Sequence, residues 1–368
     1  MGQFLQGAIS FAPTLLIAIV VFGALIFIHE LGHFLTAKWS GIKVNEFSIG
    51  MGPKLWGWQK GETLYALRLL PIGGYVSMEG EDEESDEPRA FQRAAVWKRI
   101  IVTAAGAVMN LVLGFIVLVI VVCLQGQIVS RTIYGFQENA ASQQCGLQQG
   151  DTIVAVNGRR CYIANDISYE LARSANGTAD LTVERDGETV QLEDVRFNSY
   201  TLNGQQQSGL DFIVYGLPLS PVAVLKEAAA WTMSYARLVV LSFADLVTGR
   251  IPVTDLSGPV GIVQTIGQVS TLGLESLLLL VALITVNLGV FNLLPVPPLD
   301  GSRIFNLLLP KKWYFAVMRY ERIILLALFA VLFLGLLDVP LNWLYTAAGR
   351  LLDFSTGYVE LALRALLH

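Results

Sequence analysis

The chain has 368 residues, of which 54% are hydrophobic and only 15% charged, and its mean hydropathy is +0.55. This composition excludes an ordinary soluble enzyme and indicates a polytopic membrane protein, with membrane lipid and no nucleic acid among its partners. The formal net charge of -5 says little, because the orientation of a membrane protein depends on where its Lys and Arg residues lie.

The first expected element is a transmembrane helix at about residues 10–36. The uncharged stretch from Met1 to Ile28 has no basic start and no small-residue cleavage site, so we interpret it as a retained span. It is followed by His29-Glu30-Leu31-Gly32-His33. On a helix, an HExxH sequence places two histidines on one face, where they can bind zinc, with the glutamate placed to handle a water proton. Because ionisable groups are costly in a bilayer, the motif predicts a metalloprotease site inside a membrane.

Residues 42–80 are expected to form a membrane-associated β-hairpin region. Gly and Pro alternate there with apolar residues, as in Ser48-Ile-Gly-Met-Gly-Pro53, which is typical of turns between strands. The stretch from Glu79 to Glu87 has seven acids in nine residues, and we interpret it as a solvated loop. An uncharged run then predicts a second transmembrane helix at about residues 100–124, since a span needs ~20 residues. Residues 1–125 would form the N-terminal half of a membrane core.

Residues 126–217 have the composition of a small α+β domain with short alternating strands. Its centre, Cys145-Gly-Leu-Gln-Gln-Gly-Asp-Thr-Ile-Val-Ala-Val-Asn-Gly158, resembles the G-L-x-x-G-D-x-I-x-x-x-N-G core of bacterial PDZ domains. PDZ domains bind peptides by strand addition, so peptide C-termini are possible partners; a domain that only covers the membrane site is the alternative. Cys145 and Cys161 could form a disulfide, although small buried thiols are favoured.

Residues 218–274 are expected to hold an interfacial amphipathic helix and a loop. Residues 275–368 would form the C-terminal half of the membrane core, with a third span at about 275–300 and a fourth at about 322–345. Nine basic residues lie between the first two spans and five between the last two, which predicts that both loops are cytoplasmic. The PDZ-like domain would then be extracytoplasmic.

Two histidines do not complete a catalytic zinc site, which usually has three protein ligands and an open position for water. The only other histidine is His368, so a carboxylate is the better candidate, and Asp300 follows the third apolar run. Prolines at 295, 297 and 298 should break the helix near this site, which requires a protein-lined or watery cavity at membrane depth. Asn292 could donate a hydrogen bond to a developing oxyanion, or could serve only in helix–helix contact.

The pairing of His29-Glu30-x-x-His33 with Asn292-x-x-Pro295-x-Pro297-x-Leu299-Asp300-Gly301 is similar to the site-2 protease family of intramembrane zinc metalloproteases, and most like its bacterial RseP-type members. Four further segments fit the same group: Gly50-Met-Gly-Pro53, Leu70-Pro-Ile-Gly-Gly-Tyr-Val76, Arg89-Ala-Phe91 and Ser257-Gly-Pro-Val-Gly-Ile262. Departures from the family pattern are Ser302, where a second glycine is usual, and Ala107, where many relatives have proline.

The resemblance implies that His29, His33 and Asp300 bind one zinc ion and that Glu30 is the general base. It also implies a substrate that is the transmembrane segment of a single-span protein, such as an anti-sigma factor or a remnant signal peptide. This segment would be held as an added strand by the hairpin region, with substrate-binding residues Gly73, Gly74, Tyr75, Pro295 and Pro297.

By the same resemblance, the fold is a polytopic α-helical membrane protein of about four transmembrane helices with an inserted PDZ-like α+β domain. We expect it in the bacterial inner membrane, with the active site near the cytoplasmic side. The alternative function is a non-catalytic zinc-binding chaperone or scaffold that recruits clients through the PDZ-like domain.

Overall fold

The structure is a computed structural model that describes residues 2–81, 83–174, 177–202, 205–247, 258–296 and 299–307, with a few isolated positions between 313 and 327. The predicted fourth span at about 322–345 lies almost entirely outside these residues, and Pro297 lies outside them too. The chain forms two compact units, each built from three stretches of sequence.

Three helices among the described residues are long and apolar enough to cross a membrane. They correspond to the first three predicted spans, and in hydrocarbon a helix satisfies its own backbone hydrogen bonds. The three spans are the Ala12–Trp39 part of α1 (Gly2–Trp39), α2 (Val96–Gln125) and α7 (Leu274–Phe291). The chain is therefore an integral membrane protein.

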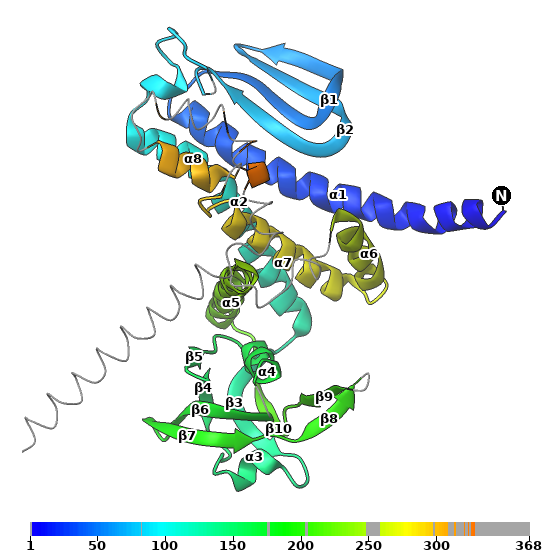
Figure 1. Ribbon diagram of the computed structural model, residues 1–368, viewed down its shortest axis with the longest axis vertical. Helices are drawn as coiled ribbons and strands as arrows, with labels where there is room; N and C mark the ends of the chain where they lie inside the picture. The colour runs from blue at the N-terminus through cyan, green and yellow to red at the C-terminus, as the bar shows by residue number, and fades with distance from the viewer. Residues whose placement is uncertain are drawn as a thin grey trace, which may run out of the picture. The chain divides into compact units, whose positions relative to one another are not determined.

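The first unit comprises Met1–Ile28, Val108–Arg237 and Ile266–Gly289. It contains a six-stranded sheet in the order β10-β3-β4-β6-β7, with β5 paired to β4, and a separate β8–β9 hairpin (Figure 1). The strands are β3 (Ile128–Phe136), β4 (Thr152–Val156), β5 (Arg159–Arg160), β6 (Thr178–Arg185), β7 (Glu188–Arg196), β8 (Ser199–Leu202), β9 (Gln205–Ser208) and β10 (Phe212–Leu217). Two short helices, α3 (Ala141–Gln144) and α4 (Ala164–Ala172), complete this part.

The motif that resembles a PDZ core supplies turns and buried polar contacts in this sheet. Asn157 and Gly158 have positive φ, +50° and +72°, and join β4 to β5 in a tight turn that Asn-Gly favours. Asp151 is fully buried, accepts a hydrogen bond from the Gln148 amide at 2.9 Å and pairs with Arg185 of β6 at 2.7 Å. These contacts explain why the motif needs these residue types, while the PDZ assignment stays a prediction.

The cysteines of this domain are both free thiols. Cys161 is fully buried in the sheet's apolar core, and burial raises the pKa of its thiol to about 12. A thiol that stays protonated is a poor nucleophile, so the buried-thiol interpretation holds for Cys161, whereas Cys145 is a free thiol that is only partly buried.

The helices of this unit pack through small residues. α5 (Pro221–Val247) brings Ala228 into an apolar cluster with Leu118 of α2 and Ala282 of α7. A Cβ at Gly114 of α2 would lie 2.6 Å from Val286 of α7, so glycine allows the close approach of these helices. α6 (Pro259–Ser270) precedes α7.

The second unit comprises His29–Ala107, Leu238–Thr265 and Val290–His368. Its sheet consists of two long strands, β1 (Val44–Lys60) and β2 (Thr63–Met78), which fold back on themselves (Figure 1). Residues 46–49 of β1 pair with residues 74–77 on one side and with residues 64–67 on the other. The predicted hairpin region is therefore a sheet in which residues 46–49 of β1 lie between the first and the last part of β2.

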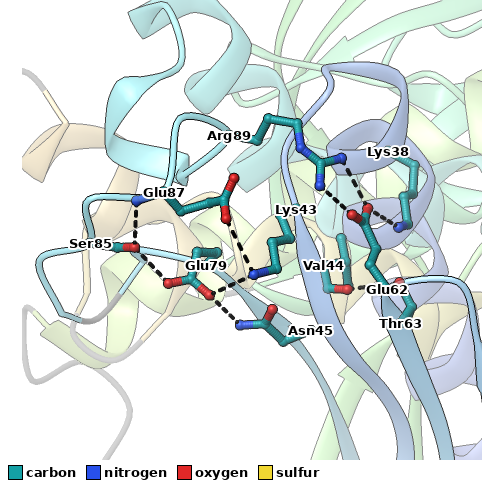
Figure 2. Close-up of polar contacts among 10 residues, drawn as sticks. All are labelled: Lys38, Lys43, Val44, Asn45, Glu62, Thr63, Glu79, Ser85, Glu87 and Arg89. Atoms are coloured by element: carbon teal, nitrogen blue, oxygen red, sulfur yellow. Dashed lines mark hydrogen bonds and ion pairs between the residues drawn. The ribbon is translucent and has the colours of Figure 1, made fainter.

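Two networks of charged groups attach this sheet to its neighbours (Figure 2). Glu62, in the turn between β1 and β2, pairs with Lys38 of α1 at 2.8 Å and with Arg89. Glu79, directly after β2, pairs with Lys43 at 3.7 Å, and Lys43 also pairs with Glu87 at 3.5 Å. The run was predicted to be a solvated loop, and two of its acids, Glu79 and Glu87, are held by Lys43.

Candidate metal centre

The HExxH motif lies on α1, close to its C-terminal end. Four residues make slightly more than one helical turn, so His29 and His33 share one face, and their ring centroids are 4.8 Å apart. His33 is only 8% exposed. Its Nδ1 lies 2.8 Å from the carbonyl oxygen of Val102 on α2. A proton on Nδ1 that is donated to this carbonyl leaves the Nε2 lone pair available.

Asp300 reaches the histidines from a break in the helical structure. α7 ends at Phe291, and Asp300 begins a new short helix, α8 (Asp300–Asn306). Asp300 thus opens a second helix instead of closing the third span, which is shorter than the predicted range 275–300. The Gly301 amide donates to the carbonyl of Asn292 at 2.7 Å, and a Cβ at Gly301 would lie 2.2 Å from the Leu294 carbonyl oxygen. Only glycine therefore fits directly after Asp300.

Three atoms of the kinds that bind zinc, two imidazole nitrogens and a carboxylate oxygen, converge at this point. Oδ2 of Asp300 lies 3.1 Å from Nε2 of His29 and 3.3 Å from Nε2 of His33, and the two Nε2 atoms are 3.2 Å apart. Ligand atoms at 2.0–2.1 Å from a tetrahedral zinc ion are themselves about 3.3 Å apart. Oδ2 of Asp300 is buried without a hydrogen-bond partner. This donor set fits a zinc ion, and His29, His33 and Asp300 are the cluster that could hold one.

Gly106 of α2 forms part of the wall of this site. A Cβ at this position would lie 2.3 Å from Nε2 of His33 and 2.8 Å from Nε2 of His29. Any larger residue would occupy the space in front of the metal-facing atoms. No sequence pattern indicates Gly106 as a site residue, because its distance from the histidines depends on helix packing.

A cleft with a volume of about 580 Å³ opens at the cluster. His29, Glu30, His33 and Asp300 line it, as do two of the predicted substrate-binding residues, Gly74 and Tyr75. Further lining residues, which the sequence did not suggest, are Met51, Val76, Ser77, Met78, Glu81, Thr103 and Arg303.

The other predicted substrate residues do not line this cleft among the described residues. Gly73 has φ of +84° and a structural role, since a Cβ there would lie 3.2 Å from Met51. Pro295 lies in the break after α7, and Pro297 is outside the described residues. The main-chain carbonyl of Asn292 accepts a hydrogen bond from Gly301. The oxyanion role predicted for the Asn292 side chain stays a prediction.

The last part of β2 forms one wall of the cleft. In the described part of the chain, residues Gly74–Ser77 pair with residues 46–49 of β1 and with no other strand segment. Residues Gly74–Ser77 also line the cleft. A tyrosine hydroxyl is already protonated at neutral pH, and burial and the neighbouring carboxylate of Glu46 raise the pKa of Tyr75 further.

These features define a class of protein: an integral membrane protein with a metalloprotease HExxH helix and a carboxylate that meets it. The model of Peptidase family M50 matches residues 17–335. The chain is 38% identical over 300 residues to a protein named as a zinc metalloprotease in Clostridium acetobutylicum, covering 79% of this chain and 85% of the relative.

Two other relatives extend the match over more of the chain. The regulator of sigma-W protease RasP of Bacillus subtilis is 28% identical over 428 residues, covering 90% of this chain and 98% of that protein. Zinc metalloprotease RasP of Geobacillus kaustophilus is 30% identical over 384 residues, covering 83% and 89%. The chain belongs to Peptidase family M50, the site-2 protease family, and is a zinc metalloprotease with zinc as its cofactor.

Proposed function

We propose that the protein is an intramembrane endopeptidase that hydrolyses peptide bonds within the transmembrane segments of single-span membrane proteins. One observation carries the proposal: a single cleft is lined by His29, His33 and Asp300, by Glu30, and by the strand segment Gly74–Ser77. Such hydrolysis needs three parts: a metal site, a carboxylate, and a strand that can pair with an extended peptide.

His29, His33 and Asp300 are the proposed zinc ligands. Zinc held there supplies Lewis-acid chemistry, which polarises the scissile carbonyl and acidifies water. Glu30 follows His29 directly and lines the same cleft, so its carboxylate is the proposed general base. It takes a proton from the attacking water and returns it to the nitrogen of the leaving amine.

The strand Gly74–Ser77 is the proposed substrate platform. A peptide bond within a helix is shielded, because its neighbours are hydrogen-bonded along the helix axis, and it must become extended before water can attack. Extended peptides add to sheets by main-chain hydrogen bonds. The pairing of Gly74–Ser77 with β1, together with its place in the cleft wall, supports this role.

The sheet itself is proposed to lie against the membrane. Trp56 and Trp58 of β1 are 62% and 47% exposed, and their ring centroids are 4.8 Å apart. Trp side chains are enriched at membrane–water interfaces, so this exposed aromatic pair supports a membrane-associated β region.

The proposed topology has four spans, a cleft towards the cytoplasm and the sheet domain of residues 126–217 outside, in a bacterial cell membrane. The distribution of Lys and Arg supports this orientation. The domain boundaries at 125, 217 and 274 and the PDZ-like nature of that domain, with peptide C-termini as partners, belong to the same proposal. The name of the Bacillus subtilis relative, regulator of sigma-W protease, supports an anti-sigma factor as the kind of substrate.

The test is cleavage of a single-span membrane protein, already trimmed outside the membrane, by the purified chain in proteoliposomes. Wild type should cut within the span, and Glu30→Gln should lose the cut while it keeps bound zinc. Glu83→Gln, which changes an exposed acid of the loop, is the matched control and should cut like wild type. Equal cutting by Glu30→Gln would remove Glu30 from the mechanism, and no cutting by wild type on several such substrates would overturn the proposal.

A further inference from the structure

The metal-facing cleft has two walls that come from distant parts of the chain. One wall is α8, which begins with Asp300, and the other is the end of β2, residues Gly74–Met78. Arg303 follows Asp300 by three residues, and Glu81 follows Met78 by three residues. Both charged side chains line the cleft, so a basic group on α8 lies near an acidic group that follows β2.

Arg303 and Glu81 form an ion pair between these walls. Nη1 of Arg303 donates to Oε1 of Glu81 at 2.5 Å, and the side chains are only 26% and 13% exposed. Charge-assisted hydrogen bonds of this kind are short and directional. Both groups are largely withdrawn from water, so the pair is only weakly screened by solvent.

An apolar contact joins the same two segments. Leu307, directly after α8, is 4% exposed and belongs to a buried cluster with Met78 and Val102. Val102 is also the residue whose carbonyl holds Nδ1 of His33. A shift of α8 relative to the end of β2 would therefore disturb a polar contact and an apolar contact together.

We propose that Glu81 and Arg303 are positioning residues that set the distance between Asp300 and the strand Gly74–Ser77. This inference rests on the proposed function, since it concerns a substrate strand added to that segment. The pairing of strands has a definite register, and a slip by one residue turns every side chain to the opposite face. The ion pair thus decides which peptide bond of the added strand comes opposite Glu30.

The test compares single and paired charge changes in a preparation whose wild type cuts the model substrate. Glu81→Arg and Arg303→Glu should each lower kcat/KM by about 100-fold, the effect expected of a misplacement of about 1 Å, and should move or broaden the cut site, as read by mass spectrometry. The double variant restores an ion pair of reversed orientation. It should recover most of kcat/KM and the original cut site, because coupled partners are not additive.

Milder variants and a matched control keep the test informative. Glu81→Gln retains an acceptor and the side-chain shape, so it should fold and bind zinc like wild type while the cut site broadens. The control is Arg93→Gln, because Arg93 pairs with Asp86 of the same loop at 3.1 Å, but its side chain is 45% exposed. Exposed pairs contribute little, and this variant should behave like wild type.

Two results would overturn the positioning role. If Glu81→Gln leaves the cut site unchanged, the pair does not control register. If the double variant is as inactive as Arg303→Glu while the Glu81→Arg single variant is active, Arg303 acts directly on the substrate. A failure of the proposed function appears differently, as absence of cutting by wild type, and zinc content measured on every variant separates both results from loss of the metal site.

Discussion

The orientation of His33 is set by Val102: Nδ1 of the imidazole lies 2.8 Å from the Val102 carbonyl oxygen, and Nε2 consequently faces Asp300 at 3.3 Å. A contact between α1 and α2 thus prepares one side of the ring for a main-chain acceptor and the other for a metal. Such partners behind a ligand commonly select its tautomer and its orientation.

Removal of a proposed ligand should reduce zinc binding directly. We expect His33→Ala and Asp300→Ala to weaken zinc affinity by more than about 100-fold, the upper range for loss of a partner behind a ligand. Metal analysis of the purified variants, with a chelator competition for affinity, provides the measurement. Glu30→Gln is the control and should retain zinc, since the proposed role of Glu30 is proton transfer. Full zinc occupancy in Asp300→Ala would show that the carboxylate is not a ligand.

Gly106→Ala should block the metal site. Its Cβ would lie 2.3 Å from Nε2 of His33, so the histidine must turn away or the helices must separate. We expect a loss of zinc and a fall in kcat/KM of at least about 100-fold. Gly23→Ala is the matched control, because a Cβ there meets nothing within 4 Å and alanine favours a helix. If Gly106→Ala binds zinc and cuts normally, the close approach of α2 to the histidines is refuted.

Glu62 should make stability depend on acid pH. Hydrogen bonds from Arg89 and Lys38 lower the pKa of its carboxyl from 4.5 to about 2. A lowered pKa in the folded state stabilises the fold above the unfolded pKa, and this stabilisation is lost as the pH falls from about 4.5 to about 2. Glu62→Gln should therefore lower Tm at pH 7 by about 2 °C, and the gap should narrow below pH 4.5 and be small at pH 2.

Thermal unfolding in detergent at several pH values provides this measurement, with Glu83→Gln as the control for loss of an exposed acid. A gap between wild type and Glu62→Gln that stays constant from pH 7 to pH 2 would contradict the role assigned to the ion pairs of Glu62.

The buried Asp211 should be necessary for the sheet domain. Its carboxylate is fully buried and accepts from the Ser142 hydroxyl at 2.5 Å and the Ser142 amide at 3.0 Å. An asparagine places an NH₂ group against one of these donors, so Asp211→Asn should cost about 1.5–3 kcal/mol. Hydrogen exchange of the α3 and β10 amides in the intact chain should rise, whereas Asp186→Asn in an exposed turn should have no effect. Unchanged exchange in Asp211→Asn would show that the contact contributes little.

The chemistry-bearing residues could be predicted because their relationships are local. His29, Glu30 and His33 lie within about one helical turn, so helix geometry alone places the two histidines on one face. The apolar runs of α1, α2 and α7 likewise require only length and composition. Asp300 was a candidate because of its residue type and its place after an apolar run. The prolines between α7 and α8 predicted a helix break, and α7 does end at Phe291, before Asp300 begins α8.

The rest depended on contacts between distant segments. Gly106 and Val102 reach His33, and Glu81 reaches Arg303, only after the helices and the sheet have packed. The hydrogen bond between His33 and Val102 joins residues 69 apart in the sequence, and the one between Glu81 and Arg303 joins residues 222 apart. For the same reason the acidic run looked like a solvated loop, although Glu79 and Glu81 are paired. Periodicity and motif spacing describe neighbours along the chain, whereas side-chain packing decides which strand edge and which charged groups surround the metal-facing atoms.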